Sequence, residues 1–432
     1  MRNKKLVRSS IALSVMLALT ACDLSSDNDF VPTVTPSTGD GTTDPVAEIV
    51  QVDGSVVKGV LRNALVTAFD GADVELASTT TDNNGDYTLD IPADFKGPVR
   101  ITVVATADST MVCDTGNCGN GVGFGDEITD VTGLELSSVG FIDATEVAND
   151  GADTPKVTVS IPVNALTTLT SKKILANTSL AQLSKSGKNG FDAASKVATQ
   201  AVGISLGLTA DNIPDNFLSI KIIDPTTISD LSAAEAQEVT AVQTQISIFN
   251  SAILETIVES QAGAGSLGLG ASINDSLTTV SNAIESLQTS VLNEFLTRAT
   301  ENIQQLVNNP IFQQEFAQLA NNLQEQGESV EFSVDIETLK NSNITEEEID
   351  EERLSQVVDA ANRLSDLINA SEGELTEDDV NEITDSVAQA AAEAAAQAAA
   401  EAAAQAAAEA AAQAAAEAAA QAAAEAAVQA AA

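Results

Sequence analysis

The sequence contains no histidine and no tryptophan, and it has a single tyrosine. Without histidine the chain can form neither a Ser-His-Asp nor a Cys-His catalytic arrangement, and it lacks the commonest zinc ligand. Acid–base chemistry by two carboxylates, as in glycoside hydrolases, stays open, but no Asp or Glu pair is distinguished by its sequence context. We therefore expect a protein that is not an enzyme and holds no cofactor, with a hydrolase as the alternative.

Basic residues are scarce as well. The chain has 19 Lys and Arg residues against 63 Asp and Glu residues, which gives a net charge of −44. A field of that sign repels nucleic acid and anionic lipid, so we expect no nucleic-acid partner. The acidity favours a solubilising surface, with attraction of divalent cations as the alternative.

The first residues carry an export signal. A basic segment precedes a short apolar stretch, Ile11 to Leu19, which is too short to span a membrane. The following Leu19-Thr20-Ala21-Cys22 resembles the cleavage motif of bacterial lipoproteins. The resemblance implies that Cys22 becomes the first residue of the mature chain and carries acyl chains, palmitate among them, that anchor it to a membrane. An ordinary signal peptide with a chance cysteine is the alternative.

The segment after Cys22 predicts a tether and leaves the choice of membrane open. Residues 23–47 are rich in Asp, Ser, Thr, Gly and Pro and have too few apolar groups to bury a core. In lipoproteins of enteric bacteria, an Asp at the position of Asp23 favours retention in the inner membrane. We expect an envelope location, with the outer membrane or cell surface preferred and the periplasmic face of the inner membrane as the alternative.

Two further cysteines, Cys113 and Cys118, lie close together in a stretch rich in Gly, Asn and Asp. In an exported protein such a pair predicts a local disulfide, which stiffens one turn more than it stabilises the whole fold. A metal site is the alternative, but beyond the lipidated position no cysteine or histidine is available to complete it.

Short β-branched runs separated by turn residues fill residues 53–105 and predict an antiparallel β-sandwich. The stretches GSVVKGVLRNALVTAFD and TTTDNNGDYTLDIP resemble the carboxypeptidase regulatory-like, transthyretin-like β-domain. The resemblance implies an accessory module and no particular activity. The loop 82–86 within it fits a hairpin turn in which Asn-Gly supplies positive φ. A calcium loop is the alternative there, so Ca²⁺ is the one cofactor left open.

From residue 163 onward the apolar period becomes that of helices. The stripes predict amphipathic helices that each bury one face in a core, with a ligand groove as the alternative. Asp192 is the candidate N-cap of the first of these helices, and Asn309-Pro310 is expected to start another. The stripe residues are Val197, Ala201, Ile204 and Leu208; Val239, Val242, Ile246, Phe249, Ile253 and Ile257; Ile284, Leu287, Val291, Phe295, Ala299, Ile303 and Leu306; and Phe312, Phe316, Leu319 and Leu323.

The stretches VNALTTLTSKK and AASKVATQAVGISLGLTADNIP resemble the helical module that follows such β-domains in other bacterial surface lipoproteins. The loop GAGSLGLG, residues 263–270, lacks the lysine and the preceding strand of a phosphate-binding loop. One short strand, residues 330–336, is expected among the helices.

Two acidic helices are expected near the C-terminus, because Thr345 and Thr376 each precede a run of acids that suits the positive end of a helix. The second helix meets no stop signal and can continue through repeats of Ala, Glu and Gln to residue 432, about 84 Å at 1.5 Å per residue. Its polar line drifts around the axis, so it is not a heptad coiled coil, and its repeated glutamates are too costly inside a bilayer for it to be a membrane span. A semi-rigid spacer, a surface for self-association and a tolerated repeat expansion remain as alternatives.

Together these observations predict a multidomain α+β protein with a small antiparallel β-sandwich, a mostly α-helical domain and a long alanine-rich C-terminal helix. We expect a lipid-anchored envelope or surface protein for adhesion, display or assembly, whose protein or glycan partner the sequence does not identify. The alternative is a periplasmic lipoprotein that binds a ligand or partner through its helical domain. The expected division is signal peptide 1–21, tether 22–47, β-sandwich 48–106, Gly/Asp-rich segment with the disulfide 107–162, helical domain 163–340, acidic helical segment 341–375 and long helix 376–432.

Overall fold

The structure is a computed structural model. It describes residues 50–118, 121–143, 157–209, 212–232, 235, 241–261, 269–325 and 348–390, and scattered residues of the C-terminal tract. The expected signal peptide, Cys22, the tether, the strand 330–336 and most of the tail lie outside these residues. Ala47–Ala432 cluster into one compact unit that contains both sheets and helices, so the fold is mixed α+β. Over the residues described, no helix is both long and apolar enough to cross a bilayer.

The strands form two larger sheets and one small one. One sheet has the order β10-β1-β11 with β5 also paired to β1, the second has the order β4-β3-β6-β9, and the small sheet has the order β2-β7-β8. The strands are β1 Val50–Val57, β2 Leu61–Arg62, β3 Leu65–Phe69, β4 Glu75–Thr80, β5 Asp86–Ile91, β6 Gly97–Val104, β7 Thr110–Val112, β8 Glu127–Ile128, β9 Glu135–Ile142, β10 Val157–Ser160 and β11 Val163–Asn164.

Pairing in the sheets is antiparallel except at β1. The ladders of β3 with β4 and β6, and of β6 with β9, are all antiparallel. β1 pairs antiparallel with β5 but parallel with β10 and β11, which the sequence pattern did not predict. A parallel partner needs a long crossover, and here the chain returns to β1 only after all the other strands. The segment 107–162 therefore completes the sheets that residues 50–104 begin.

The period of two along the strands explains which side chains they bury. In β5, Tyr87, Leu89 and Ile91 are buried while the residues between them are exposed. The hairpin before β5 has Gly85 at a φ of 80°, a left-handed conformation that glycine adopts without strain. Asp82 Oδ1 accepts hydrogen bonds from the backbone N–H groups of Asn84 and Asp86 at 2.8 and 2.9 Å. The loop 82–86 is thus closed by its own backbone donors.

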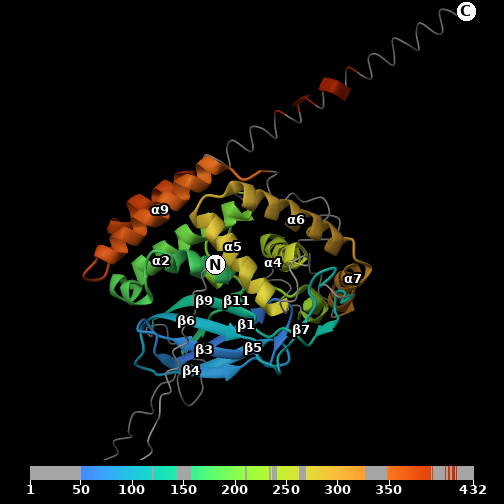
Figure 1. The fold of residues 1–432 in the computed structure, drawn as a ribbon, viewed down its shortest axis with the longest axis horizontal. Coiled ribbons are helices and arrows are strands. Elements are labelled where there is room, and N and C mark those ends of the chain that lie inside the picture. Colours follow the sequence, from blue (N-terminus) through green and yellow to red (C-terminus); the bar gives the residue numbers. More distant parts are fainter. Residues whose placement is uncertain are drawn as a thin grey trace, which may run out of the picture. The chain divides into compact units, whose positions relative to one another are not determined.

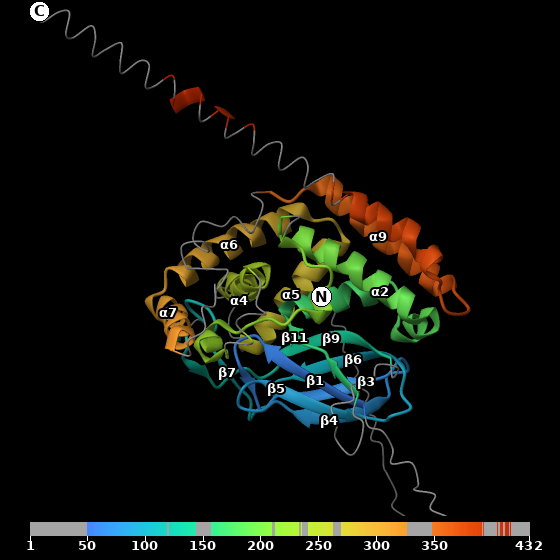
Figure 2. The same cartoon turned by 180° about the vertical axis from the view of Figure 1, so that it is seen from behind.

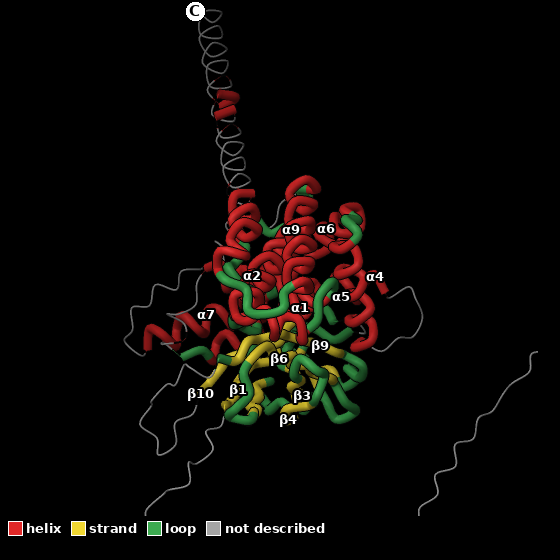
Figure 3. Tube along the Cα trace, turned by 90° about the vertical axis from the view of Figure 1, so that its left-hand side faces the viewer, coloured by secondary structure: helices red, strands yellow, loops and turns green. Residues whose placement is uncertain are grey.

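Helices cover the β6–β9 side of the sheets (Figures 1 and 2). α1 packs on β9 and α2 packs on β6, while α9 lies over α2 and α6 lies over α4. Figure 3 shows most of the helices gathered on one side of the strands. The helices are α1 Ala165–Leu175, α2 Leu180–Ser205, η2 Phe217–Ser219, η3 Pro225–Asp230, α4 Ala241–Gln261, α5 Leu269–Glu285, α6 Thr289–Val307, α7 Pro310–Glu325 and α9 Glu351–Ala370.

Two expected helix boundaries are wrong. α2 begins at Leu180 with Ser179 as its N-cap, so Asp192 lies inside it, where it pairs with Lys188 on the solvent side. The helix is instead interrupted at Gly187, whose φ of 71° is left-handed. The stripe that begins at Ile284 is also divided, because Leu287 has a φ of 52° and ends α5 in the left-handed manner common at helix C-termini.

Other helix ends follow the sequence signals. Pro310 opens α7, and the Asn309 side chain accepts a hydrogen bond from the Ile311 N–H group at 2.8 Å. The Thr376 hydroxyl accepts from the Asp379 N–H group while the Asp379 carboxylate accepts from the Thr376 N–H group, which is a capping box. Residues 377–390 are helical. Thr345 lies outside the described residues, and the helix that follows it is capped by Asp350.

The apolar core runs through both sheets and helices without interruption. The described stripe residues Ile246, Phe249 and Ile253 are buried on α4, as are Phe312 and Phe316 on α7. Phe312 also packs edge-to-face on Phe124 from the loop before β8, with the ring centroids 5.9 Å apart. The expected boundary at residue 106 falls between β6 and β7, and the one at residue 162 falls between β10 and β11, while the core is continuous across both.

Candidate functional site

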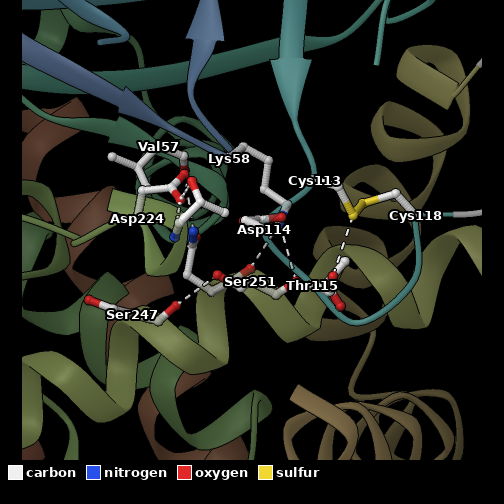
Figure 4. Close-up of polar contacts among 11 residues, drawn as sticks. Val57, Lys58, Cys113, Asp114, Thr115, Cys118, Asp224, Ser247 and Ser251 are labelled. Atoms are coloured by element: carbon white, nitrogen blue, oxygen red, sulfur yellow. Dashed lines mark hydrogen bonds and ion pairs between the residues drawn. A yellow bond between two sulfur atoms is a disulfide. The ribbon is translucent and has the colours of Figure 1, made fainter. Parts of the chain in front are cut away.

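A buried polar cluster lies where the sheets meet the helices. Lys58, which follows β1, and Asp114, which follows β7, are 0% and 1% exposed. The Lys58 Nζ atom lies 3.0 and 3.2 Å from the two carboxylate oxygens of Asp114 (Figure 4). It also donates to the backbone carbonyls of Ser251 at 3.2 Å and Asn250 at 3.4 Å on α4. Three segments distant in sequence therefore converge on one amino group.

The turn that carries Lys58 depends on the next residue. Gly59 has a φ of 60°, and a Cβ atom at that position would lie 1.8 Å from the carbonyl oxygen of Val112. No other residue type fits there without moving the backbone. This close approach brings the β1–β2 turn against the end of β7, which is the strand that leads to Asp114. The lysine and the aspartate are therefore fixed relative to each other by the local fold.

The disulfide fixes the other side of the cluster. Cys113 and Cys118, the pair that the sequence predicts, are bonded through their sulfur atoms, with Cα atoms 5.9 Å apart (Figure 4). Cys113 is fully buried and directly precedes Asp114. The Cys113 N–H group donates to the Asp126 carbonyl and its own carbonyl accepts from Gly125, each at 2.8 Å. The backbone that holds Asp114 is therefore anchored immediately before this residue.

A second buried acid, Asp224, belongs to the same cluster. It is the N-cap of η3, and its Oδ1 atom accepts from the Thr226 N–H group at 2.8 Å and from the Thr226 hydroxyl at 2.6 Å. Burial, and then the negative charge of Asp114, raise the pKa of Asp224 to about 7, against lowering by Thr226 and the positive charge of Lys58. Its Oδ2 atom is buried and has no hydrogen-bond partner among the described residues.

α4 presents a polar face to this cluster, although most of the helix is apolar. Asn250 and Ser251 are fully buried, and the Asn250 Nδ2 group donates to the Val57 carbonyl at 3.2 Å. The Ser247 hydroxyl accepts a hydrogen bond from the Ile223 N–H group at 2.9 Å, next to Asp224. These hydrogen bonds join α4 to the end of β1 and to the segment before η3, so they specify how α4 docks, although Asn250 Oδ1 has no partner among the described residues.

A different kind of site is a surface pocket of about 400 Å³ between the β6–β9 pair and helices α1 and α5. Some of its polar groups have protein partners, whereas Arg100 Nε and Ser171 Oγ have no hydrogen-bond partner among the described residues. Arg100 pairs with Asp73 at 2.6 Å and lies over the Phe69 ring, and Asn274 accepts from the Glu135 N–H group at 2.9 Å. The lining residues are Arg100, Thr102, Glu135, Ser137, Thr168, Ser171, Lys172, Leu175, Asn274, Leu277 and Thr278.

A second buried lysine lies near this pocket. Lys173 on α1 is 2% exposed in its side chain, and its Nζ atom lies 2.7 Å from Glu285 Oε1 at the end of α5. The Glu285 side chain is 26% exposed and reaches the surface. The close approach is an ion pair, but neither atom makes a hydrogen bond of good geometry within the described part of the chain.

The sequence predicted only part of this arrangement. It identified the Cys113–Cys118 pair, but it did not single out Lys58, Asp114 or Asp224. One signal was available, because a lysine between VV and GV in an apolar run is unusual, but its partner lies 56 residues away and is recognised only in the fold. Cys22, the expected lipidation site, lies outside the described residues.

No family model, curated protein or solved structure matches this chain. Among the residues that the structure describes, no group of three or more Cys, Asp or Glu side chains is arranged to hold a metal ion. The lysine–carboxylate pair with a second acid can do proton transfer and acyl chemistry within the protein, and it is closed to outside molecules.

Proposed function

We propose that this chain is a non-enzymatic, lipid-anchored protein of a bacterial envelope that displays its folded unit for adhesion or assembly. The observation that carries the proposal is Leu19-Thr20-Ala21-Cys22 after a short apolar stretch. An acylated Cys22 would anchor the chain, since each buried methylene contributes about 0.8 kcal/mol. The polar residues 23–47 would separate the folded unit from the bilayer. The outer membrane or cell surface is the preferred location.

We infer further that the two larger sheets are a β-sandwich of the carboxypeptidase regulatory-like type, which serves as a support for the helices. The inference is supported by the turn and strand that carry the resemblance, since Gly85 takes the left-handed conformation and Tyr87 and Leu89 point into the core. The Tyr87 hydroxyl donates to the Ile161 carbonyl, which ties β5 to the segment between β10 and β11.

Lipidation is tested by metabolic labelling in a Gram-negative host with a palmitate analogue that carries an alkyne. The full chain should incorporate the label, and Cys22→Ser should lose it. Cys118→Ser is the matched control, because it removes a cysteine that is not in the lipobox. Label in the Cys22→Ser chain, or none in the full chain, contradicts the proposed anchor.

Display is tested by adding protease to intact cells. A surface protein should be degraded while a periplasmic marker survives. Complete protection of the chain favours the alternative, a periplasmic lipoprotein that binds a ligand. The pocket between β6, β9, α1 and α5 is the observation in favour of that alternative, and its mixed Arg100, Glu135 and Lys172 lining suits a small polar molecule.

Assembly through the tail is tested by light scattering after size exclusion. Residues 23–432 are compared with the same chain ended at Ser386, which removes the repeats of Ala, Glu and Gln. Self-association predicts an oligomer for the long chain and a monomer for the short one. Two monomers, with the long one only more elongated, restrict the tail to a spacer or a tolerated expansion.

A further inference from the structure

The geometry of the buried cluster points to a covalent modification, and we propose that the Lys58 amino group condenses with the Asp114 side chain to form an intramolecular isopeptide bond. This bond does not depend on the proposed location of the protein, since every atom that it needs lies within the folded unit. The two residues meet only after folding, because 56 positions separate them in sequence. The bond is therefore a product of the native fold.

Proximity and confinement favour the reaction. Lys58 Nζ lies nearly equidistant from both Asp114 oxygens, at 3.0 and 3.2 Å, so the carboxyl carbon faces the nitrogen. Rotation about the Asp114 Cβ–Cγ bond then presents the face of that carbon for attack. Reacting groups held about 3–3.5 Å apart react as if at very high concentration. Gly59 and the Cys113–Cys118 disulfide hold the two backbones in this arrangement.

Burial also favours the protonation states that the reaction requires. An ammonium is not a nucleophile and a carboxylate is not an electrophile, so one proton must move from Lys58 to Asp114. Both side chains are at most 1% exposed, and burial destabilises the charged form of each group. In a site closed to water, the transfer of one proton from the Lys58 ammonium to the Asp114 carboxylate removes two buried charges at once.

The bond changes balance without an oxidant or any further reactant. The neutral Lys58 nitrogen forms a bond to Asp114 Cγ, and the nitrogen loses one proton. One Asp114 oxygen receives a proton and leaves as water. The product is a neutral amide whose single N–H group can donate to the Ser251 carbonyl, which lies 3.2 Å from the lysine nitrogen. Two buried charges disappear, and exclusion of water from the site opposes hydrolysis.

We assign to Asp224 the transfer of a proton between the Lys58 nitrogen and the departing Asp114 oxygen during the condensation. Its Oδ1 atom is held by Thr226, while its Oδ2 atom has no hydrogen-bond partner among the described residues and can carry a proton. Figure 4 draws it in the same buried cluster, and it interacts electrostatically with both Lys58 and Asp114. A neutral Asp224 can give its proton toward the departing oxygen and regain one from the nitrogen.

The first experiment is the mass of residues 23–432, purified and reduced. The expected mass is lower than that of the sequence by one water molecule. A tryptic digest should lack cleavage after Lys58 and contain a branched peptide that joins residues 58 and 114. The full mass overturns the proposal. So does a water loss that maps to an Asp-Gly step such as Asp53-Gly54 or Asp70-Gly71, where a cyclic imide forms instead.

Variants sharpen this measurement. Lys58→Met should have its full mass, and Lys173→Met should keep the water loss, because it alters the other buried lysine. Asp114→Asn should lose ammonia in place of water and reach the same final mass as the unaltered chain. A water loss that survives in Lys58→Met contradicts the bond. If Lys58→Met does not fold, the branched peptide of the unaltered chain still decides the question.

The role of Asp224 is tested by kinetics. Chains kept in denaturant from the time of lysis are diluted to start folding, and samples are quenched and weighed over time. Asp224→Asn should form the bond roughly 100-fold more slowly, a typical contribution of a positioned acid. Asp230→Asn, an exposed carboxylate on the same short helix, is the matched control. Equal rates for Asp224→Asn and the unaltered chain overturn this role, provided that both have the same unfolding midpoint.

Discussion

The two buried lysines of this protein form ion pairs of similar length in very different surroundings. Lys58 and Asp114 are both sealed from solvent, and the lysine has two further carbonyl acceptors on α4. Lys173 is equally buried, but its partner Glu285 reaches the surface. A carboxylate that reaches water can be solvated when its partner is removed, whereas a sealed one cannot.

The surroundings also differ in composition. A second acid, Asp224, interacts with the Lys58 pair and keeps its proton to about pH 7. The N–O distances of the two pairs are similar, at 3.0 Å and 2.7 Å. The comparison indicates that the reactivity of a buried ion pair depends more on the groups around it than on this distance. The sealed pair has an acid and fixed backbones beside it. The Glu285 pair joins two helices at the edge of the core.

The largest difference should appear when each lysine is replaced by methionine, which keeps most of the side-chain length. Lys58→Met removes the proposed bond as well as the cation and leaves Asp114 buried without a partner, so it should lower the free energy of unfolding by at least about 3–5 kcal/mol. Lys173→Met should cost about 1 kcal/mol or less, because Glu285 can turn toward water. Urea unfolding of residues 23–432 at pH 7 measures both. Equal losses would show that the exposure of the partner does not matter.

Sequence patterns predicted the elements that frame this comparison. The strands around Tyr87 and Ile101, the start of α7 at Pro310 and the capping box at Thr376 follow from local signals, because turn residues, caps and apolar periods act over a few positions. The Cys113–Cys118 disulfide follows from the close spacing of two cysteines in a chain that the sequence predicts to be exported. These features depend on neighbours in sequence.

The features that sequence analysis missed depend on distant contacts. The break between α5 and α6 requires Leu287 in a left-handed conformation, and no sequence rule predicts that for a leucine. The Lys58 cluster requires the β1–β2 turn, the end of β7, η3 and α4 to meet, which only the fold determines. Lys58 itself lies in the stretch that resembles a known β-domain, where it appears as one more strand residue.

A smaller effect is expected in the pH dependence of the free energy of unfolding, because only the Lys58 pair has Asp224 beside it. The pKa of Asp224 is raised from 3.8 to about 7, chiefly by burial, which persists whether or not Lys58 and Asp114 are bonded. Between these values the folded chain holds a proton that the unfolded chain releases. This group therefore lowers the free energy of unfolding as pH rises from about 4 to 7, and its contribution levels off above pH 7.

Asp224→Asn should remove that part of the slope, since an amide does not titrate. Unfolding midpoints in urea at half-unit steps from pH 5 to 8 provide the measurement, and the difference between the two chains isolates Asp224 from the other carboxylates. The free energy of the variant should fall less steeply with pH. If the free energies of the two chains change in parallel with pH, the group that binds the proton in the folded cluster is not Asp224.

The smallest effect should come from the disulfide, which is present beside only one of the two lysines. The ring that Cys113 and Cys118 close is short, so Cys113→Ala with Cys118→Ala should cost at most about 2 kcal/mol by loop entropy. Its main consequence should be positional, because Asp114 follows Cys113 directly. The double variant should therefore form the Lys58–Asp114 bond more slowly, while the loss of unfolding free energy caused by Lys173→Met stays unchanged in it.

Adding reductant to the unaltered chain during refolding should slow formation of the bond equally, and reductant should not affect the double variant. A bond that forms at the normal rate without the disulfide would mean that Gly59 and the β7 contact alone hold the pair in place.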